Sequence, residues 1–148
     1  MGQLTQSAEF FGFTLLVRRI SGARWLSKRL ANRLLAIAPT LHTHWNHGNA
    51  IHQANLALGE IALAEDNTRL ACEHLLAAGA SLGSPQLNSF GPNMRLALKL
   101  LERGERKSVL EYFESCRRFW KTSGGKLDAW KADVEAGRTP DFKANLWY

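Results

Sequence analysis

The sequence predicts an all-α fold: a short antiparallel helix-pair solenoid of about seven helices. Two observations predict it. Apolar residues recur at three- and four-residue intervals along most of the chain, and the strict alternation typical of strands is absent. One pattern of small and apolar residues also occurs twice, offset by 38 residues, from Asn55 to Asn93. A repeat of this length is typical of helix pairs that stack to build a shared core.

Four helices are predicted in the N-terminal half, over residues 7–20, 23–38, 49–64 and 68–78. Pro39 ends the second helix, and residues 39–48 form a loop. The short turn 65–67 supplies an N-cap for the fourth helix, which Gly79 closes. A turn this short forces the third and fourth helices to lie antiparallel.

Three more helices are predicted after a long connection over residues 80–92, which carries two glycines and two prolines. They span residues 93–102, 106–121 and 127–136, and residues 141–148 form an extended apolar tail. We expect a single domain: a degenerate first unit (1–38), two repeats (49–79 and 93–121), a capping helix (125–136) and the tail. Terminal units of such repeats are usually atypical.

The repeated residues have identical spacing in both copies. The first copy reads Asn55-x2-Leu58-Gly59-x2-Ala62 and Ala71-x3-Leu75-x2-Ala78; the second reads Asn93-x2-Leu96-Ala97-x2-Leu100 and Val109-x3-Phe113-x2-Cys116. We expect the small residues Gly59 and Ala71 to lie where two helices cross closely. The larger apolar residues should fill the space on either side.

This pattern resembles the tetratricopeptide repeat (TPR), whose signature includes Leu-Gly in the first helix and Ala-x3-Phe in the second. Leu58-Gly59, Ala71 and Phe113 match it. Asn55 and Asn93 stand where the family has an aromatic residue, and the period exceeds the family's repeat of about 34 residues. The resemblance covers residues 49–121.

The resemblance implies a partner-binding groove, because the first helix of each TPR pair lines a concave face. Its expected lining is Gln53, Leu56, Glu60, Leu63, Met94, Leu98 and Leu101. This largely apolar set suits an amphipathic helix or an extended apolar peptide. Alternatively, the chain fills the groove itself with residues 10–17 or 146–148, or buries it in a homodimer. Arg95 and Lys99 look isolated, which disfavours capture of a C-terminal carboxylate.

The connection over residues 83–92 is a second candidate contact region. Leu87 and Phe90 are expected to anchor it, and the possible contact residues are Gln86, Asn88, Ser89 and Phe90. The competing interpretation is a cap that covers the end of a helix.

Basic residues are concentrated near the N-terminus, although the net charge of the whole chain is only +6. Residues 1–38 hold one acidic residue, Glu9, against Arg18, Arg19, Arg24, Lys28, Arg29 and Arg33. This patch could contact an anionic partner, so a nucleic-acid-binding function is the alternative hypothesis. It could equally be the solvated face of an amphipathic helix. A membrane partner is disfavoured, and the apolar run 10–17 is too short to span a bilayer.

Residue patterns for catalysis or cofactor binding are absent from the sequence. The spacing of His42, His44, His47 and His52 fits no standard zinc pattern, and loop and helix-surface positions explain these residues and His74 more simply. Cys72 and Cys116 are expected to be reduced packing residues of a cytoplasmic protein. The sequence therefore predicts a non-catalytic protein–protein interaction module without cofactors, of an adaptor, chaperone or immunity-like kind.

Overall fold

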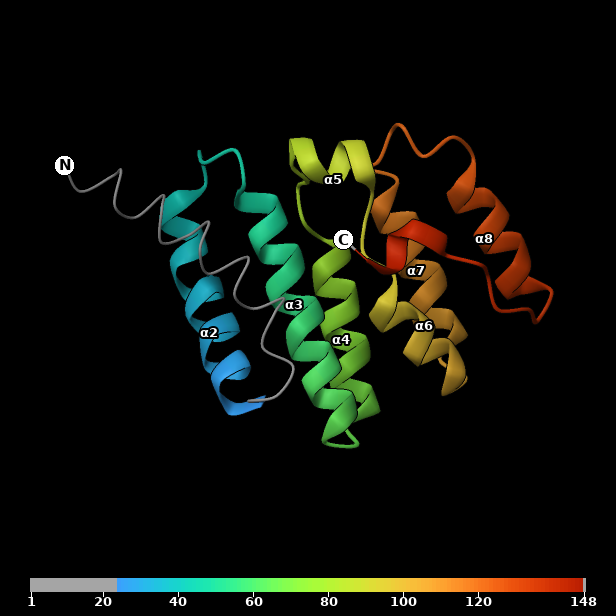
Figure 1. Cartoon of the computed structure of the whole chain (residues 1–148), viewed down its shortest axis with the longest axis horizontal. Helices are drawn as coiled ribbons and strands as arrows, with labels where there is room; N and C mark the ends of the chain where they lie inside the picture. Colours follow the sequence, from blue (N-terminus) through green and yellow to red (C-terminus); the bar gives the residue numbers. More distant parts are fainter. Residues whose placement is uncertain (1–23, 148) are drawn as a thin grey trace.

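The computed structural model describes residues 24–147, and every regular element in that part of the chain is helical (Figure 1). The all-α prediction is confirmed; the helix predicted over residues 7–20, with Arg18 and Arg19, lies outside the described residues. The elements are α2 (Arg24–Ile37), η1 (Ala38–Leu41), α3 (His47–Ala64), α4 (Thr68–Gly79), α5 (Pro85–Phe90), α6 (Arg95–Glu102), α7 (Arg106–Cys116), α8 (Lys126–Glu135) and η2 (Lys143–Leu146), where η marks a 3-10 turn.

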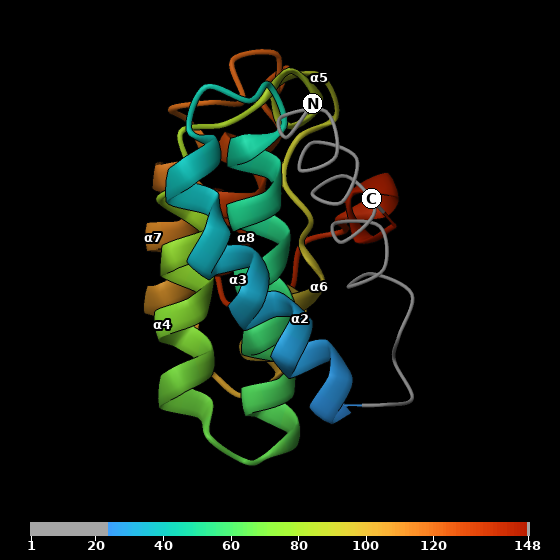
Figure 2. The same ribbon diagram turned by 90° about the vertical axis from the view of Figure 1, so that its left-hand side faces the viewer.

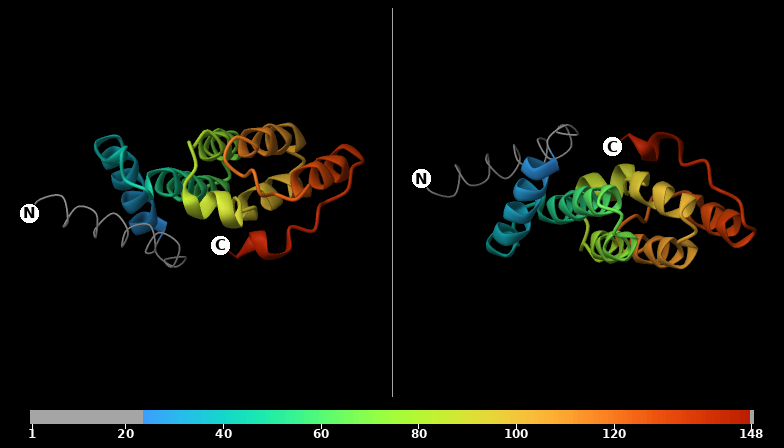
Figure 3. Two further views of the ribbon diagram at one scale, coloured as in Figure 1. Left: turned by 90° about the horizontal axis from the view of Figure 1, so that it is seen from above. Right: turned by 90° about the horizontal axis from the view of Figure 1, so that it is seen from below.

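The long helices form two layers. Figure 3 shows α3 and α6 in one layer and α4 and α7 in the other. Three-residue turns join α3 to α4 and α6 to α7, so each pair is antiparallel. α2 packs against α3 at one end of the molecule, and α8 packs against α7 at the other (Figures 1 and 2). The C-terminal segment returns to the α3–α6 side of the molecule.

The predicted bounds of α2, α4 and α8 are right to within one residue, whereas α7 is shorter than expected. It ends at Cys116 instead of residue 121. Phe119 and Trp120 follow in a turn and are both buried. Leaving the helix lets both aromatic rings reach the core, which a straight continuation along one helix face would not allow.

The predicted connection over residues 80–92 contains a helix, α5, that sequence periodicity missed. The Ser84 side chain caps it by accepting a hydrogen bond from the Leu87 backbone N–H at 3.1 Å, and Pro85 occupies the first turn. Gly91, at φ 85°, ends it. Six residues are too few for an amphipathic pattern, so only the Ser-Pro start and the glycine stop could have revealed it.

The expected close crossing at Gly59 is confirmed. A Cβ atom added there would overlap the side chain of Leu96 and lie 3.4 Å from the backbone oxygen of Ala71. The apolar positions of both repeats are buried in the core as expected: Leu58, Leu75, Leu96, Ala97, Val109 and Phe113. Small residues at the crossing therefore let α3, α4 and α6 approach closely.

His52 was expected on a helix surface, and that expectation is wrong. Its side chain is 0% exposed, and its Nδ1 donates to the carbonyl of Ala78 at 3.1 Å. The ring stacks on Tyr112, whose hydroxyl donates to the carbonyl of Asn93 at 3.0 Å. This polar contact set joins α3, α4 and α7 inside the core, where an unsatisfied donor or acceptor would be costly.

Both cysteines are free and buried, as expected for packing residues. Burial raises the pKa of the Cys116 thiol far above its ordinary range, and burial also raises the pKa of Cys72. A raised pKa and burial both disfavour the reactive thiolate form of these side chains.

The tail was expected to be extended and apolar, but a polar residue fixes its course. Asn145 is almost fully buried, and its side-chain amide donates to the carbonyls of Phe90 and Pro92 at 3.1 and 3.0 Å. Its own carbonyl accepts from Met94 N–H at 2.8 Å. Phe142 packs against the rings of Phe113 and Trp130. These contacts hold the tail against the α5–α6 junction.

Candidate partner-binding pocket

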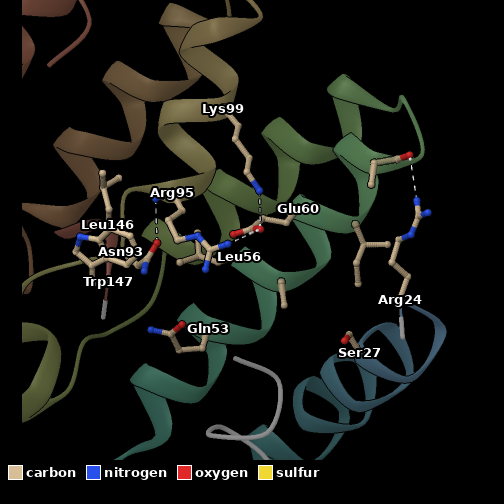
Figure 4. A pocket seen from close by; sticks show the side chains of 13 residues that line it. Arg24, Ser27, Gln53, Leu56, Glu60, Asn93, Arg95, Lys99, Leu146 and Trp147 are labelled. Carbon is tan, nitrogen blue, oxygen red and sulfur yellow. Dashed lines mark hydrogen bonds and ion pairs between the residues drawn. The ribbon is translucent and has the colours of Figure 1, made fainter. Parts of the chain in front are cut away.

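A pocket of about 520 Å³ opens between α2, α3, α6 and the C-terminal segment (Figure 4). Residues from all four contribute to its lining: Arg24, Ser27, Gln53, Leu56, Ala57, Glu60, Ile61, Ala64, Asn93, Arg95, Lys99, Leu146 and Trp147. Elements far apart in the sequence therefore build one site.

One face of α3 forms the floor of the pocket. Lining residues occur along this helix from Gln53 to Ala64 at intervals of three or four positions, which places them in one stripe. The apolar members are Leu56, Ala57, Ile61 and Ala64. The floor can therefore contact an apolar side chain.

The wall opposite α2 carries charged side chains from α6. Lys99 Nζ donates to Glu60 Oε2 at 2.7 Å, and an Arg95 guanidinium nitrogen lies 3.5 Å from the same oxygen (Figure 4). From α2, Arg24 donates to the carbonyl of Ala64 at 3.5 Å. Arg95 and Lys99, which looked isolated in the sequence, thus converge on one carboxylate.

Two amide side chains also face the pocket. Gln53 is 8% exposed and forms no hydrogen bond with any residue of the described part of the chain through its side chain. Asn93 accepts from the Arg95 backbone N–H at 2.9 Å. Each side-chain amide can both donate and accept hydrogen bonds, as is needed to pair with the N–H and C=O groups of a peptide backbone.

The C-terminal segment supplies the last wall through Leu146 and Trp147. Trp147 is 83% exposed, so most of its ring is available to a ligand. The sequence had offered residues 146–148 as a plug of the groove; the described residues Leu146 and Trp147 form its rim. No local signal places the tail there, because Asn145 reaches across more than 50 residues of sequence to fix it.

Only part of the expected groove lines this pocket. Gln53, Leu56 and Glu60 do, whereas Leu63, Met94, Leu98 and Leu101 do not. Leu56, Leu63 and Met94 are buried, and Leu98 and Leu101 pack partly against the core. The expectation of an exposed apolar stripe fails because α2, α4 and α6 all pack on α3, and because Met94 is buried where its backbone N–H donates to the carbonyl of Asn145 in the tail.

The candidate contact residues of the 83–92 region lie on α5, at one end of the helices (Figure 1). Gln86 accepts a hydrogen bond from the buried Asn49 at 3.0 Å, and Leu87 is buried, so these two residues attach α5 to the rest of the molecule. Asn88 and Ser89 are exposed. Phe90, expected as an anchor, is 55% exposed. The region therefore covers a helix end while presenting three side chains outward.

The predicted anionic-partner patch is divided in the structure. Arg24 lines the pocket, and Lys28 forms an ion pair with Glu65 at 3.0 Å. Arg29 and Arg33 are exposed on α2. The described basic residues therefore do not form one continuous patch: one lines the pocket, one is ion-paired and two are exposed on α2. Arg18 and Arg19 lie outside the described residues.

The histidines do not assemble into a metal centre in the part of the chain that the structure describes, where no group of three His, Cys, Asp or Glu side chains is placed to hold an ion. His74 hydrogen-bonds Asn55 at 3.0 Å, and burial lowers its pKa. Within residues 24–147, no helix has the length and apolar character needed to cross a membrane.

Comparison of the chain with protein-family models, curated proteins and solved structures finds no match. The resemblance to TPR proteins therefore stays a prediction that depends on the residues of the two repeats.

Proposed function

We propose that this protein is a non-catalytic, cytoplasmic interaction module with a TPR-like helix-pair arrangement, and that its pocket binds a segment of another protein. The observation that carries the proposal is the pocket itself: an α3 floor on which the apolar residues Ala57 and Ala64 are accessible, bordered by charged and amide side chains and by the exposed Trp147 ring. Such a module would act as an adaptor, a chaperone or an immunity-like protein.

The mixture of side chains favours a polypeptide over a purely apolar ligand. A polypeptide segment presents apolar side chains and backbone amides along the same few residues. The pocket offers Ala57, Ala64 and the Trp147 ring to the former and the side-chain amide of Gln53 to the latter. An exposed Trp is also a frequent anchor in protein interfaces, because it contributes a large apolar contact area and an N–H donor.

The TPR-like arrangement is supported by the two antiparallel pairs, α3–α4 and α6–α7, and by the contact of α4 with α7. Equivalent positions of the two repeats, such as Ala71 and Val109, are buried in the same core. In a helix-pair solenoid, each pair covers the apolar face that its neighbour leaves open.

Site-specific crosslinking tests the proposal. A photoreactive amino acid at Ala57, on the partly exposed pocket floor, should form an adduct with one particular host protein. The same group at the exposed Ala77 on α4, outside the pocket, should not. Ala57→Trp should fill the floor and abolish the interaction, whereas Ala77→Trp should retain it.

Three other results would refute the proposal, and each identifies a different occupant. An adduct within the same chain would show that the pocket is filled by its own residues. An adduct between two copies would indicate a homodimer. Capture of nucleic acid, lost at moderate salt, would favour the alternative function through Arg29, Arg33 and the other N-terminal basic residues, since phosphate contacts weaken steeply with salt.

A further inference from the structure

Charge in the pocket is unbalanced. Among the described residues, Arg24, Arg95 and Lys99 line it together with a single carboxylate, that of Glu60. Glu60 Oε2 lies 2.7 Å from Lys99 Nζ and 3.5 Å from an Arg95 nitrogen, while Arg24 donates to an uncharged backbone carbonyl. Three cations against one anion leave an excess of positive charge that attracts a negatively charged ligand.

We propose, on the basis of the protein-binding function above, that the bound segment is acidic and that its carboxylate takes the place of Glu60 beside Lys99 and Arg95. In this proposal Glu60 is an internal counter-ion. It occupies the two cations while the pocket is empty and competes with the partner's carboxylate when the partner arrives.

The geometry permits such an exchange. The side chains of Lys99 and Arg95 are 44% and 51% exposed, so a ligand can reach both from solvent. Glu60 is 27% exposed and can turn toward water when its place is taken. Ion pairs exposed to this degree contribute little to folding, so their rearrangement does not threaten the fold.

The neighbourhood of Glu60 determines what else the segment must contain. Leu56 and Ala57 lie one turn earlier on α3, and the buried amide of Gln53 lies about two turns earlier (Figure 4). A segment with its carboxylate beside Lys99 would therefore place adjacent residues over the partly exposed Ala57 and near the side-chain amide of Gln53. The chemistry that fits is an Asp or Glu next to an aliphatic or aromatic residue.

Selection from a random 12-residue peptide library displayed on phage tests this chemistry. We expect enriched peptides with an acidic residue beside an apolar one. A synthetic consensus peptide, labelled with fluorescein, should bind the wild-type protein in an anisotropy titration. Replacing its acidic residue with the amide should weaken binding.

Two pairs of variants then separate the counter-ion role from a general effect of charge. Glu60→Gln should strengthen binding of the acidic peptide about two- to fivefold, because the competing carboxylate is gone. Glu73→Gln, which removes a carboxylate from the Arg69 ion pair on α4, should change nothing. Lys99→Gln should weaken binding by a similar factor, whereas Lys131→Gln, at the Glu114 pair on α8, should not.

Each alternative result overturns a defined part of the reasoning. If Glu60→Gln weakens binding of the acidic peptide, or binds it with the same affinity as Glu73→Gln, the Glu60 carboxylate does not compete with the peptide. If the enriched peptides are apolar or basic and Ala57→Trp abolishes their binding, the ligand is not acidic, but the proposal of a protein-binding pocket still stands. Enrichment of no peptide, or of peptides that Ala57→Trp still binds, would refute both proposals.

Discussion

Adding a methyl group at Gly59 is the sharpest test of how the repeats pack. In an open helix, Gly→Ala stabilises a protein by about 0.5–1 kcal/mol, because glycine loses more backbone freedom on folding. At Gly59 the new Cβ would overlap the side chain of Leu96, which is fully buried, and would lie 3.3 Å from His74 Cβ. The overlapping atom is Cδ2 of Leu96, and because this side chain is buried in the core it must move against its neighbours to make room.

Overpacking of this kind typically costs about 1–3 kcal/mol. Offset by the gain in helix propensity, Gly59→Ala should lower the free energy of unfolding by about 1 kcal/mol, and Gly59→Leu by about 3 kcal/mol or more. For a chain of this size, 1 kcal/mol corresponds to a melting temperature lower by about 2–4 °C.

Urea denaturation followed by circular dichroism at 222 nm measures the effect. Ala77→Gly, at an exposed position in α4, measures the effect of glycine on helix propensity without any packing change. It should lower the free energy of unfolding by about 1 kcal/mol. If Gly59→Ala instead stabilises the protein by the amount that Ala77→Gly loses, the position is open. The close crossing of α3 with α4 and α6 would then be wrong, and with it the physical basis of the repeat.

Three further predictions concern side chains that are buried or partly buried. Tyr112→Phe removes the hydroxyl that donates to the carbonyl of Asn93 and should cost about 1–2 kcal/mol in the same urea assay; unchanged stability would mean that this hydrogen bond is not formed. Burial lowers the pKa of His74 below 6.5, so the unfolded chain takes up this proton first as the pH falls. The free energy of unfolding should therefore decrease as the pH is lowered through 6.5 toward the folded-state pKa. It should decrease less steeply in His74→Gln. Equal pH dependence of the two proteins between pH 7.5 and 5.5 would contradict this. Cys72 and Cys116 should resist DTNB at pH 8 until urea unfolds the chain, and rapid native-state labelling would contradict their burial.

Local sequence signals were sufficient for most of the helices. Proline and glycine stops, the three-residue turns and the three- and four-residue apolar intervals depend on residues close in sequence, so α2, α4 and α8 were predicted to within a residue. The small residues of the repeat also predicted the crossing at Gly59, because two helices can approach closely only where side chains are small. α5 lacked such a signal because it is too short to show a period.

The candidate site depended instead on contacts between distant residues. The resemblance to TPR proteins predicted Gln53, Leu56 and Glu60 as part of the groove, but could not show that packing would bury Leu63.

The sequence by itself determined that the described part of the chain is all-helical and contains two repeated helix pairs, because helix formation and close crossings are set by near neighbours and by residue size. Tertiary structure decided where the pocket opens and which charges meet in it. Lys99 reaches Glu60 across 39 positions, and Asn145 carries the tail to the rim across more than 50. Such pairings depend on how whole helices pack in three dimensions, which no local pattern of residues encodes.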